Sequence, residues 1–115
     1  MNQVVYKIMT EAQWADFEAG KVFAGASIDL TDGYIHLSTE DQMRETAARH
    51  FAGQKGLMLV AVAAAGLDEA LRYEASRGGD LFPHLYRHMT SEDVIWAKPL
   101  PLDALGRHLF PELDC

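Results

Sequence analysis

Apolar and polar positions predict that the chain begins with a strand and a helix. Residues 4–9 are rich in β-branched and aromatic side chains, which favour extended backbone. Thr10 and Gln13 then have the spacing of a capping box, and Gly20 is a natural residue to end a helix. We therefore predict a helix over residues 11–19.

A second strand and a second helix follow in the same order. Residues 21–31 have weak periodicity and several turn-forming residues, so we expect a loop there. Residues 34–37 are predicted to form a short strand. The capping-box spacing recurs at Thr39 and Gln42, which predicts that a helix begins at this point. Its core-facing residues recur every four positions and are Met43, Ala47 and Phe51.

The second half of the chain is rich in predicted strands. Residues 57–62 are continuously apolar, as is typical of a central strand that is buried on both faces. Residues 71–74 alternate apolar and charged side chains, which predicts an edge strand or a half-buried strand. Residues 82–86 contain Pro83, which has no backbone N–H and therefore favours an edge strand or extended segment. Residues 94–97 are the last predicted strand.

Prolines and short helical turns complete the predicted order of elements. Pro99 and Pro101 are expected to stop the last strand, while residues 67–70 and 103–109 are expected to form short helical segments. Because helices come early and strands dominate later, the order disfavours a βαβ sheet and favours an α+β fold. We expect a single domain over residues 1–115, with a mixed or antiparallel sheet and two main helices.

Composition and charge narrow the classes of function. Apolar residues make up 49% of the chain, which argues against disorder, and the net charge of −7 argues against electrostatic binding of nucleic acid. Arg72, Arg77 and Arg87 are nevertheless close enough in sequence to form a local basic pocket. Cys115 is the only cysteine, so an intramolecular disulfide is excluded. No signal peptide is visible, and the longest apolar run, residues 57–65, is too short to span a membrane, so we expect a cytoplasmic protein.

The first candidate site lies where the second strand meets the second helix. In a strand, His36 and Ser38 point away from Ile35 and Leu37. Together with Thr39 they would lie beside the positive end of the helix, which suits phosphate or another anion. His36 is then a candidate to bind a ribose or diphosphate, or to act as an acid or base. The alternative is a plain helix cap beside a satisfied polar histidine, and such caps are common.

The second candidate site lies on the later strands. Arg72 and Glu74 share one strand face, and so do His84 and Tyr86, with Arg87 following directly. A carboxylate close to an arginine suits a ribose hydroxyl or a developing cation. The alternative is a surface Arg–Glu pair, which would contribute about 0–1 kcal/mol to stability.

A metal site is not expected. His84 and His88 are four residues apart, but Pro83 disfavours the helix that would bring them together. The chain also lacks an HExxH motif, a Walker loop, a GxGxxG motif and a GxSxG motif.

Three segments together resemble a known family. They are residues 32–39 (DGYIHLST), residues 82–86 (FPHLY), and the opening residues 5–8 (VYKI) with Trp14 downstream. Over almost its whole length the chain resembles the small bacterial family catalogued as domain of unknown function 952.

That family looks like a minimal version of the ADP-ribosyltransferase fold, in which a split antiparallel sheet holds NAD in a cleft. The resemblance implies that His36 holds the adenosine ribose and that Ser38 or Thr39 supports it. Glu74 is the candidate for the residue that steers attack on the nicotinamide ribose. His84 and Arg87 would orient the acceptor or the diphosphate.

We therefore predict a protein that binds NAD or a related nucleotide-like ligand, with ADP-ribosyltransferase-like chemistry if it is an enzyme. The expected catalytic residues are His36, Glu74 and His84. The expected ligand contacts are Lys7, Ser38, Thr39, Arg72, Tyr86 and Arg87. The alternative is a module that binds a ligand without catalysis, or that binds another protein.

Overall fold

A long antiparallel ladder forms the first sheet. In the computed structural model, which describes residues 4–75 and 79–111, strands β1 (Val4–Thr10), β4 (Leu57–Ala63) and β8 (Val94–Leu100) pair in the order β1-β4-β8. The prediction of a buried central strand is confirmed, because β4 lies in the middle of this sheet and five of its side chains are buried.

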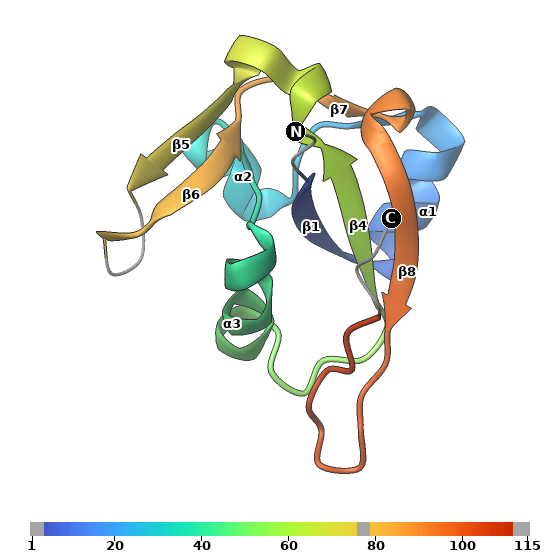
Figure 1. Cartoon of the computed structure of the whole chain (residues 1–115). Helices are drawn as coiled ribbons and strands as arrows, with labels where there is room; N and C mark the ends of the chain where they lie inside the picture. The colour runs from blue at the N-terminus through green and yellow to red at the C-terminus, as the bar shows by residue number, and fades with distance from the viewer. Residues whose placement is uncertain (1–3, 76–78, 112–115) are drawn as a thin grey trace.

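A second antiparallel sheet carries the segments that the sequence singled out. Its strands are β3 (Ile35–His36), β6 (Leu81–Leu85) and β5 (Leu71–Ala75), in the order β3-β6-β5. Figure 1 shows β5 and β6 on the opposite side of the molecule from β8. The short strands β2 (Val22–Phe23) and β7 (Met89–Thr90) pair with each other in a separate antiparallel sheet.

One backbone bridge connects the two larger sheets. The Tyr6 N–H donates to the Ser38 carbonyl at 2.8 Å, and the Ser38 N–H donates back to the Tyr6 carbonyl at 2.9 Å. Because Tyr6 belongs to β1 and Ser38 follows β3, the strands form one split antiparallel arrangement. The expected α+β class with antiparallel sheets is therefore confirmed.

The helices begin largely where the capping signals predicted. The first, α1 (Glu11–Gly20), has the complete box, with the Gln13 N–H donating to Thr10 Oγ1 at 3.0 Å and the Thr10 N–H donating to Gln13 Oε1 at 2.9 Å. At the start of α3 (Glu40–His50), the backbone N–H of Thr39 donates to the side chain of Gln42.

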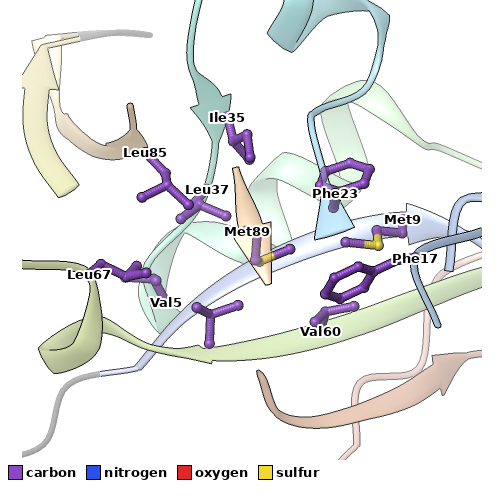
Figure 2. Close-up of a cluster of buried hydrophobic side chains, with 11 residues drawn as sticks. Val5, Met9, Phe17, Phe23, Ile35, Leu37, Val60, Leu67, Leu85 and Met89 are labelled. Carbon is purple, nitrogen blue, oxygen red and sulfur yellow. The ribbon is translucent and has the colours of Figure 1, made fainter. Parts of the chain in front are cut away.

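Hydrophobic residues pack on both faces of the first sheet. One face carries a cluster that includes Val5 and Met9 from β1, and Figure 2 shows Met9 beside Phe17 from α1 and Phe23 from β2. The opposite face packs against α3. Its buried residues are Tyr6, Ile8, Leu57, Leu59, Ala61 and Leu100 from the sheet, with Met43 and Ala47 from the helix. The helical core stripe predicted from the sequence is confirmed for Met43 and Ala47, whereas Phe51 follows the end of the helix and packs half-buried against the same cluster. No helix in the described part of the chain is long and apolar enough to cross a membrane.

The loop predicted over residues 21–31 is wrong in part, because this segment holds β2 and the short helix α2 (Ser27–Asp32). The Asp29 carboxylate accepts the Ala26 N–H at 2.8 Å, which caps the start of the helix. Gly33 then ends it in a left-handed conformation, at φ 88°. A helix of six residues, which is fewer than two turns, is too short to give a clear periodic signal.

The predictions about proline and about the C-terminal segment also need correction. β6 is a central strand despite Pro83. The residue pairs between β3 and β6 end at His84, next to Pro83, and the Pro83 carbonyl still accepts the Leu37 N–H at 3.0 Å. β8 continues through Pro99 because it is an edge strand. Residues 103–109 form a turn instead of a helix, since the Asp103 carboxylate accepts the N–H of Leu105 and of Arg107.

Candidate functional site

Three neighbouring strands, with the residue before β3 and the residue after β6, place three pairs of polar or aromatic residues on one face of the second sheet. The pairing of β3 with β6 places His36 opposite His84, and the pairing of β5 with β6 places Arg72 opposite His84. Residues two positions away share the same face, because side chains alternate along a strand. We call this surface the His–Tyr face, and its residues are Tyr34, His36, Arg72, Glu74, His84 and Tyr86.

A hydrogen-bonded group lies at the β5–β6 end of the His–Tyr face. Glu74 Oε1 is 2.9 Å from His84 Nδ1 and accepts the Tyr86 hydroxyl at 2.6 Å. The bond from Tyr86, followed by that with His84, holds the pKa of Glu74 below its ordinary value. The same bond raises the pKa of Tyr86. His84 is buried, whereas the Glu74 side chain remains 38% exposed. The structure therefore presents an anionic carboxylate beside a fixed imidazole.

Aromatic rings fill the middle of the His–Tyr face. The Tyr34 ring stacks on His84, with centroids 4.1 Å apart and planes 27° apart, and it lies 5.2 Å from Tyr86. The two imidazoles of His36 and His84 lie edge to face at 5.6 Å. The Arg72 guanidinium lies 5.0 Å from the Tyr86 ring centroid, a cation–π distance. The face thus combines π surfaces, a cation and an anion.

Behind His36 lies a buried ion pair that the sequence reading did not include. Asp29 Oδ1 is 2.6 Å from His36 Nδ1, and Asp29 Oδ2 accepts the Lys7 ammonium at 2.9 Å. The Asp29 side chain is 0% exposed and that of His36 is 29% exposed. On the outer side of the ring, His36 Nε2 lies 3.0 Å from Asp32 Oδ2. Both nitrogens of this imidazole therefore meet a carboxylate.

The electrostatics of this pair follow from burial and from mutual attraction. Burial lowers the pKa of Lys7, and the Asp29 charge only partly offsets that effect. Burial alone would raise the pKa of Asp29, but the Lys7 charge and the hydrogen bonds from His36 and Ala26 bring it below its ordinary value. Asp29 is consequently an ionised carboxylate inside the protein.

The structure brings together some of the predicted site residues. His36, Glu74, His84, Arg72 and Tyr86, taken from both candidate sites, share the His–Tyr face. Their roles toward a ligand stay predictions. Arg77, which was grouped with Arg72 in the possible basic pocket, lies outside the described residues.

The other predicted ligand contacts are engaged within the fold. Ser38 Oγ lies 3.0 Å from Thr46 Oγ1 on α3, and the Thr39 N–H donates to Gln42. Lys7 lies behind Asp29 and also donates to the His36 carbonyl at 3.0 Å. For these residues, no contact within residues 4–75 and 79–111 places a side chain on the His–Tyr face.

Arg87, another predicted ligand contact, also forms its bonds within the fold. Its guanidinium forms a two-pronged bond with Asp93, at 3.0 Å to each carboxylate oxygen. It also donates to the carbonyls of His88 and Gly66. In the described residues no group of three or more His, Cys, Asp or Glu side chains has an arrangement that would hold a metal ion.

Comparison with known proteins identifies the family. The model of the family described as "Protein of unknown function (DUF952)" matches residues 8–97. The chain belongs to the DUF952 family. The resemblance predicted from residues 32–39 and 82–86 is thereby confirmed, and the six residues of the His–Tyr face lie inside the matched range.

Solved structures support the same relationship. The chain is 47% identical to protein CC0527 from Caulobacter crescentus in its crystal structure, with 92% of this chain and 93% of that chain covered and a TM-score of 0.88. The solution NMR structure of CC0527 gives 48% identity, 90% of each chain covered and a TM-score of 0.82. No curated protein matches the chain.

Asp29, Asp32 and Tyr34 are residues whose place in the site was not predicted. Tyr34 had a usable signal, because it lies two positions before His36 and therefore on the same face of the strand. Asp29 had none, because its importance depends on Lys7, which is 22 residues away in the chain.

Proposed function

We propose that the His–Tyr face binds NAD or a related nucleotide-like ligand, with chemistry of the ADP-ribosyl-transfer type. The observation that carries this proposal is that six polar and aromatic side chains, from β3, β5, β6 and the residues next to β3 and β6, gather on one face. Ligand sites commonly combine aromatic surface with a few polar groups that fix orientation. A dinucleotide has planar bases, ribose hydroxyls and phosphates, and this face offers a partner for each of them.

Each class of ligand group has a matching side chain. Tyr34 and Tyr86 offer ring faces on which a base or a nicotinamide stacks. Arg72 is exposed at the edge of the face, where a planar guanidinium suits a phosphate. His36 is partly exposed and suits a ribose hydroxyl or a phosphate oxygen. In this proposal Arg72 takes the anion-binding role in place of Thr39, whose N–H is occupied.

Glu74 suits the chemical step. In ADP-ribosyl transfer the bond from the ribose C1′ to the nicotinamide nitrogen breaks, and its electron pair leaves with nicotinamide. Positive charge then develops on the ribose before a nucleophile bonds to C1′. A carboxylate held ionised by Tyr86 and His84 stabilises such a charge. The split antiparallel arrangement of the strands supports the likeness to a minimal ADP-ribosyltransferase.

A ligand-binding module without catalysis is the second candidate. The observation in its favour is that one oxygen of Glu74 already accepts the hydroxyl of Tyr86 and contacts His84. A carboxylate with these two partners fixes the positions of the Tyr86 and His84 side chains, and this structural role does not require catalysis.

Calorimetry and nicotinamide release separate these candidates. We expect the protein to bind ADP-ribose and NAD, and Tyr34→Ala to weaken binding about tenfold through loss of one stacking contact. Nicotinamide release by the wild-type protein, lost in Glu74→Gln with affinity retained, supports the enzyme. Glu18→Gln, on the exposed side of α1, is the matched control. Binding without release favours the module, and absence of binding to either ligand refutes the proposal.

A further inference from the structure

Asp29 is the point at which three parts of the fold meet. Its carboxylate accepts the Lys7 ammonium from β1, the Ala26 N–H from the start of α2, and the His36 N–H from β3. It also contacts His36 Nδ1, at 2.6 Å. A side chain with so many fixed partners and no exposed surface cannot move without disturbing all of them.

The contact between Asp29 and His36 fixes both the proton and the direction of the imidazole. An ionised carboxylate only accepts hydrogen bonds, so Nδ1 must carry a proton and donate it. The ring is then held from behind, and Nε2 is directed to the outer side. Lys7 balances the charge of Asp29, so the carboxylate stays ionised although it is buried.

The second carboxylate on the ring has a different character. Asp32 meets Nε2 at 3.0 Å, but its side chain is 40% exposed and it is the last residue of α2. A ligand oxygen can replace this partner at low cost, because water readily solvates the displaced carboxylate. The buried partner is therefore the permanent one, and the exposed partner is exchangeable.

We propose that Asp29, supported by Lys7, is the positioning residue that holds His36 with Nδ1 protonated and Nε2 presented to the ligand. The assignment of Nε2 to a ligand rests on the function proposed above, whereas the hold on Nδ1 does not. The role parallels that of the carboxylates that orient imidazoles in other sites, where the bond at one ring nitrogen decides what the other can do.

NMR of the imidazole nitrogens tests the hold on Nδ1 without a ligand. In the wild-type protein we expect a His36 Nδ1–H signal that exchanges slowly with water, because the acceptor is fully buried. The double variant Lys7→Met/Asp29→Leu removes both charges of the buried pair and the acceptor oxygens of residue 29, and it should lose that signal. Asp32→Asn is the matched control, since it changes the exposed partner of the same ring and should keep the Nδ1–H signal.

Two outcomes overturn the proposal. One is a wild-type His36 whose Nδ1 carries no proton, a result that needs no variant and stands even if the double variant fails to fold. The other is a folded double variant that keeps the slowly exchanging Nδ1–H signal. Backbone amide spectra and thermal melts establish that the fold is retained.

Binding measurements test the connection with the ligand. The double variant should weaken ADP-ribose binding about tenfold, as expected for loss of one hydrogen bond to a charged group. Once His36→Ala has been made, adding the double change should weaken binding no further. An equal tenfold loss in that background contradicts a role through His36. If the wild-type protein binds no ADP-ribose, the proposed function fails, while the NMR result still decides the positioning role.

Discussion

Replacing Asp29 by Asn removes the charge that balances Lys7 while keeping the shape of the side chain. In the variant, Lys7 keeps the His36 carbonyl as a hydrogen-bond acceptor, at 3.0 Å, but no longer faces an anion. Removing one partner of a buried ion pair costs about 3–5 kcal/mol. Lys7 can limit the loss by releasing its proton, which at neutral pH costs about 5 kcal/mol for a lysine of ordinary pKa 10.5.

The converse change should cost less. In Lys7→Met, Asp29 loses its cation but keeps the donors of Ala26 N–H, His36 N–H and His36 Nδ1. We expect a loss of about 1–3 kcal/mol, because a hydrogen-bonded carboxylate tolerates burial better than an ammonium with one carbonyl. Small domains have a free energy of unfolding of about 5–15 kcal/mol, so both losses are measurable.

The pH dependence has a defined sign. Loss of the anion lowers the pKa of Lys7 in the folded variant further below its unfolded value of 10.5. The unfolded state then binds more protons, so the free energy of unfolding of Asp29→Asn should rise with pH up to about that value. This rise should be steeper than in the wild-type protein, where Asp29 still favours the charged form.

Urea unfolding at neutral pH and near pH 9, analysed by linear extrapolation, measures these differences. Glu45→Gln is the control, because its pair with Arg49 is exposed and contributes at most about 1 kcal/mol. Three results would contradict these expectations: a stability of Asp29→Asn within about 1 kcal/mol of wild type, a larger loss in Lys7→Met than in Asp29→Asn, or no added pH dependence in Asp29→Asn.

Three further predictions concern elements away from the His–Tyr face. Arg87→Ala should lower the free energy of unfolding by about 1–3 kcal/mol, because Asp93 then keeps only the Thr90 donors, and a loss below 0.5 kcal/mol in urea would contradict this. The pKa of Asp93 is lowered despite its burial, so its contribution to the free energy of unfolding is present above about pH 3.8 and disappears as pH falls through the folded pKa. Asp93→Asn should therefore flatten the dependence of stability on pH in this acid range. An unchanged dependence would contradict this assignment. In thermal melts, Phe17→Ala should lower the free energy of unfolding by about 3–5 kcal/mol, whereas Leu105→Ala, at 76% exposure, should lower it by less than about 0.5 kcal/mol. Similar losses in the two variants would contradict the position of the core.

The features that were predictable from the sequence are local. The capping pairs Thr10/Gln13 and Thr39/Gln42 depend only on residues three apart, and they mark the starts of α1 and α3. The shared face of His84 and Tyr86 follows from the alternation of a strand. The buried run of β4 needs only its own composition.

The features that were missed depend on partners far away in the chain. Pro83 looked like an edge residue because the sequence does not show that β3 stops pairing beside it. Asp29 looked like part of a loop because its role needs Lys7 and His36 to meet in space. Asp103 took backbone N–H groups that a helix would have used, and this competition is decided by a few hydrogen bonds.

The most direct test of the proposed function is chemical-shift mapping of the labelled protein with ADP-ribose and NAD. The proposed function predicts shifts that concentrate at Tyr34, His36, Arg72, His84 and Tyr86 and that saturate as ligand is added. It is contradicted if neither ligand shifts these signals, or if the shifts gather elsewhere, such as around the hollow lined by Leu67, Asp68, Glu69 and Ala70.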